Sequence, residues 1–292
     1  MKRRQFLAAS AAGALVLSRP HQLFALDADN MYRKEIGIQL YTLRNEINED
    51  VAATLKAVAD AGYQQVECYG FPNAKPMMKA AEDNGLAMNS THFEWDSVVN
   101  PDKKGVQPFG EILEAANDAG LTHLVIPYLA DENRKSLDDY KQLCERCNRS
   151  AEEAKKAGIQ LSYHNHAFEF KPMDGGKTGY DVLIEEFSPD MHFEVDVFWI
   201  QVGGKDPVDL IRKLKGRVSQ LHLKDLNKSV KTPEYGSIPK EAFEELGDGV
   251  IDMEPIIDVA KEAGVKICHV EQDHSPHPIE SIQQSMAYLK KL

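Results

Sequence analysis

The chain has 292 residues, of which 42% are hydrophobic and 27% are charged. These proportions exclude a disordered chain, a collagen-like repeat and a small disulfide-stabilised protein, and they leave room for one large domain or two ordinary ones. The formal net charge of -12 repels nucleic acid and anionic lipid over most of the surface, so we expect no nucleic-acid partner.

The first 25 residues resemble a twin-arginine export signal. Arg3 and Arg4 precede an uncharged, Ala-rich run at residues 8–17, which is too short for a membrane helix of roughly 20 residues. We expect cleavage near Ala25, the twin-arginine translocase as a transient partner, and a periplasmic or otherwise exported protein with no stable membrane anchor. The alternative interpretation is a basic N-terminal helix.

The four cysteines are predicted to be unpaired thiols. Cys144 and Cys147 lie on a helical pattern, and no second pair accompanies them to complete a zinc site. Cys68 and Cys268 stand alone in apolar stretches.

Helix-like segments along the chain end in Gly and are followed by apolar, β-branched stretches that read as buried strands. The predicted strands are residues 36–41, 64–69, 87–92, 123–128, 160–165, 191–197, 218–223 and 266–271. Helical patterns between and after them cover residues 51–61, 110–119, 137–157, 207–214, 253–263 and 279–292.

Strand and helix alternate without a linker, which predicts an α/β fold: a single (β/α)8 TIM barrel over residues 34–292. An open, doubly wound sheet is the structural alternative. Such a sheet normally has a Gly-rich phosphate loop after its first strand, and the sequence contains no G-x-G-x-x-G or P-loop motif.

Polar side chains gather at the carboxyl ends of the predicted strands, where barrel enzymes place their chemistry. His164, Asp196, His222 and Glu271 fall at matching depth on four neighbouring strands. These residue types can hold one divalent ion, Mn, Zn, Co or Mg, with positions left for substrate oxygens. Each taken alone has a simpler interpretation, because a strand histidine is often structural and a carboxylate often caps the next helix.

The sequence resembles the xylose-isomerase-like barrel superfamily of sugar phosphate isomerases and epimerases. The resemblance covers roughly residues 34–292 and depends on residues 37–44 (GIQLYTLR), 163–166 (YHNH), 194–196 (EVD), 222–225 (HLKD), 247–249 (GDG) and 270–271 (VE). It implies a single metal held by Glu, Asp, His and Glu on four successive strands, of which the last three correspond to Asp196, His222 and Glu271.

The chain departs from that pattern at His164, which occupies the position of the first Glu. This removes one of the two carboxylates that many family epimerases use as facing acid and base, so two-base epimerisation is in doubt. The DNA-cleaving branch of the superfamily needs a further metal-binding His where this chain has Trp199.

The resemblance implies a metal-dependent sugar isomerase or epimerase that removes a proton next to a carbonyl through an enediolate, on a non-phosphorylated sugar. Elimination of a β-oxygen from a keto-sugar or keto-glycoside is the alternative, and a non-catalytic carbohydrate-binding barrel is the rival from another class. The catalytic candidates are His166, His164, Glu271 and Lys224, and Lys224 has a structural salt bridge as its alternative.

Four further residues are candidates for contact with the sugar: His92, Glu67, Trp199 and Tyr41. The long polar segment 227–246 is interpreted either as a lid or as a solvated loop. The sequence is compatible with a homo-oligomer, and it chooses neither the sugar nor the metal.

Overall fold

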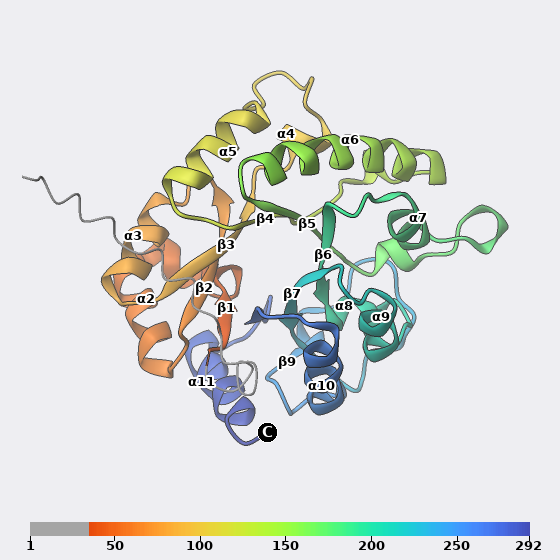
Figure 1. The fold of residues 1–292 in the computed structure, drawn as a ribbon. Coiled ribbons are helices and arrows are strands. Elements are labelled where there is room, and N and C mark those ends of the chain that lie inside the picture. Colours follow the sequence, from red (N-terminus) through yellow and green to blue (C-terminus); the bar gives the residue numbers. More distant parts are fainter. Residues whose placement is uncertain (1–34) are drawn as a thin grey trace, which may run out of the picture.

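Eight parallel strands form a closed barrel in the computed structural model, which describes residues 35–292 (Figure 1). The strands are β1 (Gly37–Gln39), β2 (Gln65–Phe71), β3 (Ala87–Phe93), β4 (His123–Ile126), β5 (Gln160–His164), β6 (Met191–Asp196), β7 (Val218–Leu223) and β10 (Cys268–Val270). They follow one another around the barrel in chain order, and β10 pairs with β1 to close it. The predicted TIM barrel is therefore confirmed, while the predicted export signal lies outside the described residues.

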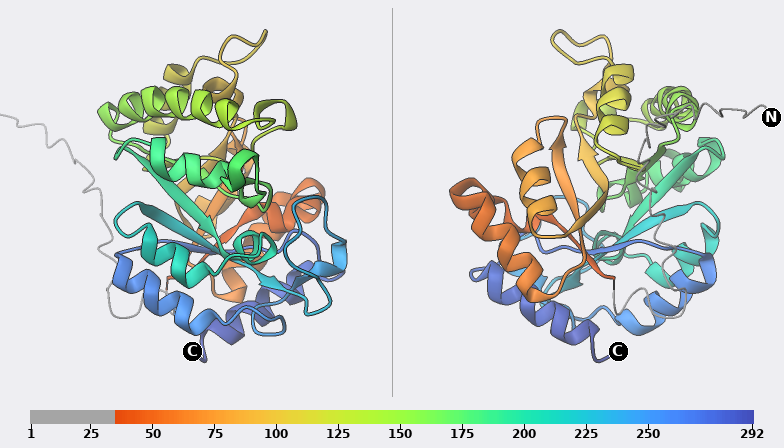
Figure 2. Two further views of the ribbon diagram at one scale, coloured as in Figure 1. Left: turned by 90° about the vertical axis from the view of Figure 1, so that its right-hand side faces the viewer. Right: turned by 60° about the vertical axis from the view of Figure 1, so that its left-hand side comes forward.

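Helices surround the barrel and alternate with the strands (Figure 2). They are α2 (Arg44–Ala61), α3 (Lys75–Asp83), α4 (Asp96–Val99), α5 (Phe109–Asp118), α6 (Leu137–Lys156), α7 (Gly179–Glu186), α8 (Val197–Val202), α9 (Pro207–Lys213), α10 (Met253–Ala263) and α11 (Pro278–Leu289). Gly62 and Gly264 end α2 and α10 in the left-handed conformation, as glycine allows. Within residues 35–292, none of the helices has both the length and the apolar composition needed to span a bilayer.

The sequence pattern gave no bounds for α3, and it did not predict α4, α7 and α8. The start of α7 carried a readable signal, since Thr178 and Asp181 form a reciprocal capping box. The helix α8 has only six residues and begins where β6 ends, so its pattern merges with that of the strand.

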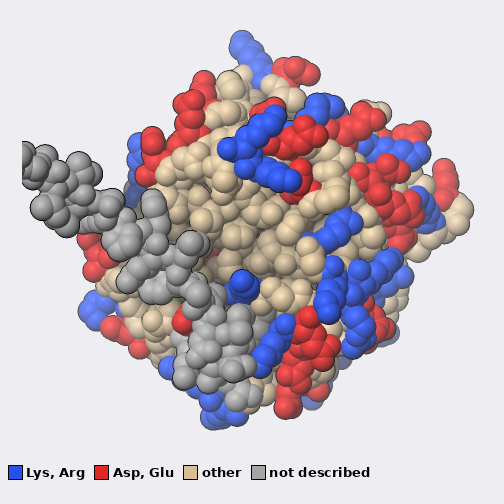
Figure 3. Space-filling model, viewed as in Figure 1, with Lys and Arg blue, Asp and Glu red and all other residues tan. Residues whose placement is uncertain are grey.

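The strand residues that face away from the barrel axis pack under the helices, and Ile38, Val66, Leu124 and Val195 are fully buried there. The four cysteines are buried and unpaired, as predicted. On the face of the molecule seen in Figure 3, acidic and basic side chains are interspersed around the rim.

The segment after β7 contains two short strands that were not predicted, β8 (Asp225–Leu226) and β9 (Phe243–Glu244), which pair antiparallel. The buried Asp225 carboxylate fixes the chain beyond them. It accepts hydrogen bonds of 2.8–3.1 Å from the backbone N–H groups of Leu226, Gly247, Gly249 and Ile251. A side chain at position 249 would collide with this carboxylate, which explains the glycine there.

Candidate metal centre

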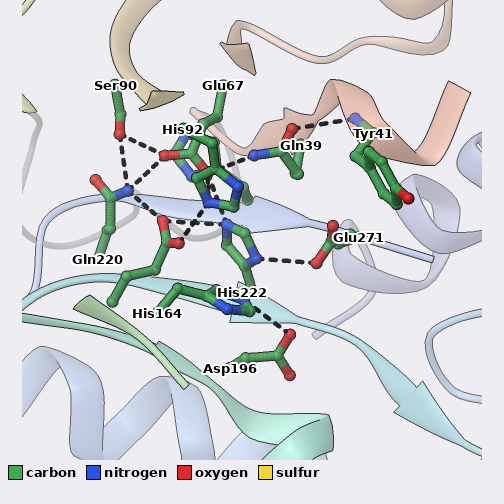
Figure 4. A network of polar contacts seen from close by, with 12 residues as sticks. Gln39, Tyr41, Glu67, Ser90, His92, His164, Asp196, Gln220, His222 and Glu271 are labelled. Carbon is green, nitrogen blue, oxygen red and sulfur yellow. Dashed lines mark hydrogen bonds and ion pairs between the residues drawn. The ribbon is translucent and has the colours of Figure 1, made fainter. Parts of the chain in front are cut away.

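His164, Asp196, His222 and Glu271 come together at the carboxyl ends of β5, β6, β7 and β10, which are adjacent in the barrel (Figure 4). One ligand atom from each lies within 4.8 Å of the others. The four residues are not in one hydrogen-bond register, because His164 pairs with Glu194 and His222 pairs with His269 across the sheet. Because the strands of a closed barrel are staggered, residues that are not hydrogen-bond partners can lie at the same level of the barrel.

The two carboxylate oxygens of Asp196 face different surroundings. Oδ1 accepts a 3.1 Å hydrogen bond from the backbone N–H of Trp199 and so caps α8. Oδ2 lies 3.4 Å from His164 Nε2 and 3.0 Å from Lys224 Nζ, without hydrogen-bond geometry to either. The side-chain amide of Asn165 bonds both backbone groups of Asp196, which fixes the end of β6 against β5. Asp196 is therefore both a helix cap and a candidate ligand.

His164 is buried, and neither ring nitrogen finds a hydrogen-bond partner among residues 35–292. Unsatisfied buried polar atoms are rare and call for an explanation such as an ion. Oδ2 of Asp196 also has no hydrogen-bond partner among the described residues. Imidazole nitrogens and carboxylate oxygens both bind divalent cations, so the residues at this position suit such an ion.

The ring of His222 is held from both sides by carboxylates. Its Nδ1 lies 3.0 Å from Glu271 Oε2, and its Nε2 lies 2.7 Å from Glu67 Oε2. Burial acts to lower the pKa of His222, but Glu194 and Glu271 outweigh it and hold that pKa well above the usual value. A site that favours a positive charge here also suits a cation, for which His222 Nδ1 would serve as the ligand while Nε2–H would donate to Glu67.

Beneath this group, a second layer of polar residues fills the barrel. Glu67, His92, Glu194 and His222 also place ligand atoms within 4.8 Å of one another. Gln220 donates to both carboxylates of this layer, at 2.6 Å for Glu67, while His92 Nε2 lies 2.8 Å from Glu194 Oε2. These carboxylates already have N–H partners, so we interpret the layer as support for His222 rather than a second ion site.

Lys224 is buried among three carboxylates. Its Nζ lies 3.0 Å from Asp196 Oδ2, 2.7 Å from Glu271 Oε2 and 2.8 Å from Asp273 Oδ1. Burial alone would lower the pKa of Lys224, but these acids raise it well above the usual value. Burial acts to raise the pKa of Glu271, but the charges of Lys224 and His222 outweigh burial and hold that pKa well below its usual value. Both groups are therefore charged at neutral pH.

Residues 55–292 match the model of the family described as xylose isomerase-like TIM barrel. The chain belongs to this family. An inosose dehydratase from Clostridium perfringens is 28% identical over 244 residues, which cover 75% of this chain and 81% of that protein. The crystal structure of a sugar phosphate isomerase/epimerase from Parabacteroides distasonis has a TM-score of 0.70 and 27% identity, and the match covers 88% of this chain and 94% of that one.

A third similar structure is that of the IOLI protein with a bound zinc atom. Its TM-score is 0.64 at 14% identity, and the match covers 88% of this chain and 95% of that one. Identity this low shows the shared fold alone.

In this xylose isomerase-like barrel, His166 lies where the candidate metal centre meets a cleft. Its ring stacks parallel to Phe168, with centroids 5.3 Å apart, and lies 5.1 Å from Trp199. Burial, followed by His164 and Lys224, lowers the pKa of His166 well below the usual value, so the imidazole is neutral at pH 7. Its backbone N–H donates a 2.8 Å hydrogen bond to the buried Glu169, which also accepts from Tyr163.

The four residues predicted to contact a sugar lie in different surroundings, and their roles remain predictions. Trp199 is half-buried on the wall of the cleft, and Tyr41 is exposed on the rim. His92 is nearly buried against Glu194, and Glu67 is fully buried below His222.

Two buried amides that support this site were not predicted from the sequence. Gln39 donates a 2.9 Å hydrogen bond to Glu67, and Gln220 joins Glu67 to Glu194. Both are amides at inward positions of apolar strands, and that signal could have revealed them. The bond from Lys224 to Asp273 depends on the path of the loop after β10, and sequence periodicity does not report that path.

Proposed function

We propose that this protein is a divalent-metal-dependent enzyme of the sugar isomerase/epimerase kind, which removes the proton next to the carbonyl of a non-phosphorylated keto-sugar. The observation that carries the proposal is the convergence of His164, Asp196, His222 and Glu271 beside a cleft lined by His166. When bound, an ion such as Mn, Zn, Co or Mg polarises the carbonyl and hydroxyl oxygens of the sugar and stabilises the enediolate.

His166 is the base that the structure favours. Its imidazole is neutral at pH 7, its Nδ1 has no hydrogen-bond partner among the described residues, and its ring is held by Phe168 and Trp199. A general base in this position contributes roughly 100- to 10,000-fold to the rate. Glu271 has its pKa held well below the usual value, so it serves better as a ligand than as a proton acceptor. The charged Lys224 keeps Asp196 and Glu271 ionised.

Elimination is the second candidate reaction, and two observations favour it. The inosose dehydratase from Clostridium perfringens is a relative over most of its length. In addition, His164 stands where two-base epimerases of this family carry a carboxylate. After proton removal, the same enediolate would expel a β-oxygen instead of being reprotonated.

Elemental analysis followed by NMR in heavy water tests the proposal. We expect about one divalent ion per chain and metal-dependent entry of deuterium next to the carbonyl of a keto-sugar such as 3-ketoglucose. We expect His166→Gln to slow this exchange by at least about 100-fold while metal content stays near one. His277→Gln, on an exposed histidine, is the matched control. A metal-free protein that binds sugar without exchange would support the carbohydrate-binding rival instead.

The products separate the two reactions. Reprotonation returns a sugar with the same number of oxygens, whereas elimination releases water or an alcohol and creates an enone that absorbs in the ultraviolet. We expect one of these products to accumulate in the same NMR sample.

We also propose that residues 1–25 direct export, which would place the enzyme among non-phosphorylated sugars. Replacing Arg3 and Arg4 by Lys should leave the protein in the cytoplasm, as measured by cell fractionation. Export of this variant at the normal level would contradict the proposal.

A further inference from the structure

The imidazole of His166 lacks the support that usually fixes a histidine base. The tautomer and direction of such a ring are normally set by a hydrogen bond that one nitrogen donates to a backbone carbonyl or a carboxylate. Within residues 35–292, the buried Nδ1 of His166 has no such partner. The orientation of this ring therefore depends on the groups that pack against it.

Aromatic rings surround the His166 side chain. The Phe168 ring lies within 8° of parallel to it, with centroids 5.3 Å apart. Tyr128 meets it edge-on at 5.3 Å, and Trp199 is tilted by 35° at 5.1 Å. Because Phe168 is the parallel one of these three neighbours, the plane of the imidazole follows the plane of the Phe168 ring.

The Phe168 ring is itself held by Arg134. The guanidinium carbon of Arg134 lies 3.4 Å from the centre of that ring, which is the contact distance of a guanidinium on an aromatic face. The Arg134 side chain is 16% exposed, and such a contact is stronger where water is largely excluded. Phe168 therefore links the base to a cation that covers its ring.

Arg134 reaches this stack from a different part of the barrel. It lies in the segment after β4, whereas His166 and Phe168 lie in the segment after β5. Its guanidinium donates hydrogen bonds to the Asp131 carboxylate and, at 3.4 Å, to the Tyr128 hydroxyl. Arg134 is therefore anchored in its own segment and ties that segment to the one that carries the base.

The backbone of His166 has a separate anchor. Its N–H donates a 2.8 Å hydrogen bond to Glu169 Oε2, and Glu169 Oε1 accepts a 2.8 Å hydrogen bond from the Tyr163 hydroxyl. These bonds fix where the side chain starts, but they leave its torsions free. The direction of the imidazole still depends on the stack with Phe168 and Arg134.

We propose that Arg134 is a positioning residue for the base His166 and that it acts through Phe168. The proposal rests on the proposed function, because the stack matters to the reaction only if His166 removes the proton. A displacement of about 1 Å at a reacting group can lower the rate about 100-fold. Lysine cannot replace Arg134 here, because its flexible ammonium keeps the charge and lacks the planar group that stacks.

Deuterium exchange into 3-ketoglucose by metal-loaded protein tests this role. We expect Arg134→Lys to lower kcat by about 10- to 100-fold while KM and metal content stay unchanged, because the substitution displaces the base and leaves the metal ligands in place. Arg149→Lys, at an exposed arginine of α6, is the matched control. An unchanged kcat, or a loss of metal that accounts for the lower rate, would overturn the proposal.

A double-mutant cycle tests the route through Phe168. Phe168→Leu should itself lower kcat. If Arg134 acts on the base through that ring, adding Arg134→Lys to Phe168→Leu should change kcat by less than about 2-fold. Losses that multiply, as they do for independent sites, would overturn the proposed route.

An NMR measurement separates this proposal from the proposed function, because it needs no reaction. In metal-free protein labelled with ¹³C-histidine, the ring signal of His166 is identified by its loss in His166→Gln. We expect Arg134→Lys and Phe168→Leu each to move that signal toward the position of the exposed His277, because the ring current of Phe168 no longer acts on a fixed imidazole.

The two measurements have distinct outcomes. If Arg134→Lys leaves the His166 signal unchanged, the positioning role is overturned even when the wild-type protein exchanges deuterium. If the signal moves as expected but the metal-loaded wild-type protein exchanges no deuterium, the stack stands as the device that orients His166 and the proposed reaction falls.

Discussion

Replacing Lys224 by Met tests the electrostatics of the candidate metal centre. The ammonium group is the buried positive charge that Asp196, Glu271 and Asp273 share, at distances of 2.7–3.0 Å. Methionine keeps most of the side-chain volume and removes the charge. Breaking a buried ion pair by removing one partner costs about 3–5 kcal/mol, because the remaining charges stay buried and unpaired. We expect the free energy of unfolding of metal-free protein to fall by that amount at pH 7.5.

The same substitution should strengthen metal binding. Two unit charges 4 Å apart interact by about 4 kcal/mol at an effective dielectric constant of 20, so an ion held by Asp196 and Glu271 is repelled by Lys224. Asp273 neutralises part of that repulsion. We therefore expect an affinity gain of about 10- to 100-fold. At equal free metal this adds about 1.4–2.8 kcal/mol to the stabilisation by the ion.

Urea unfolding with EDTA and with saturating Mn²⁺ or Zn²⁺ measures both effects, and a chelator competition titration gives the affinity. Lys215→Met, at an exposed lysine, is the control for the change of side chain. If Lys224→Met were as stable as wild type in EDTA, or bound metal no more tightly, the ammonium would not be the charge that balances these carboxylates, and the reasoning would be refuted.

Three further substitutions test other parts of the structure. Glu67→Gln should weaken metal binding by about 10- to 100-fold in a chelator titration, because Glu67 orients His222, and unchanged affinity would contradict that role. Burial raises the pKa of Glu169 to about 8, above its value in the unfolded chain, so its protonated form stabilises the fold at low pH. As pH rises from about 4.5 to 8, urea unfolding should show wild type losing up to about 5 kcal/mol relative to Glu169→Gln, and a constant difference would count against this. Asp225→Asn should lower the free energy of unfolding by about 3 kcal/mol, because an amide cannot accept from all four backbone N–H groups, whereas the exposed Asp258→Asn should change it little.

The barrel could be predicted because its signals are local. Each helix that ends at a glycine such as Gly62 or Gly264 is followed by a short apolar run, and this repeats until the sheet closes. The metal quartet was predictable for a related reason. Alternation along a strand separates inward from outward residues, and parallel strands end on the same side of the barrel, so His164 and His222 could be placed near each other.

The remainder of the site depends on tertiary contacts that the sequence pattern does not encode. Asp273 reaches Lys224 because of the path of one loop. Arg134, Phe168 and Tyr235 meet in the cleft because three loops of different lengths fold over the same rim. The register that pairs His164 with Glu194 and His222 with His269 was not predictable either, because counting along single strands ignores the stagger between them.

The Asp196 carboxylate is oriented before any cation binds. One oxygen is engaged by the first turn of α8 as soon as the chain folds, so the other is already aimed before any ion or sugar arrives. The conformational entropy of the Asp196 side chain is therefore lost when the protein folds. Cation binding does not have to order this side chain a second time. The backbone N–H of Trp199 binds the Asp196 carboxylate, and the same residue lines the cleft. Trp199 therefore fixes the candidate ligand and forms part of the cleft wall.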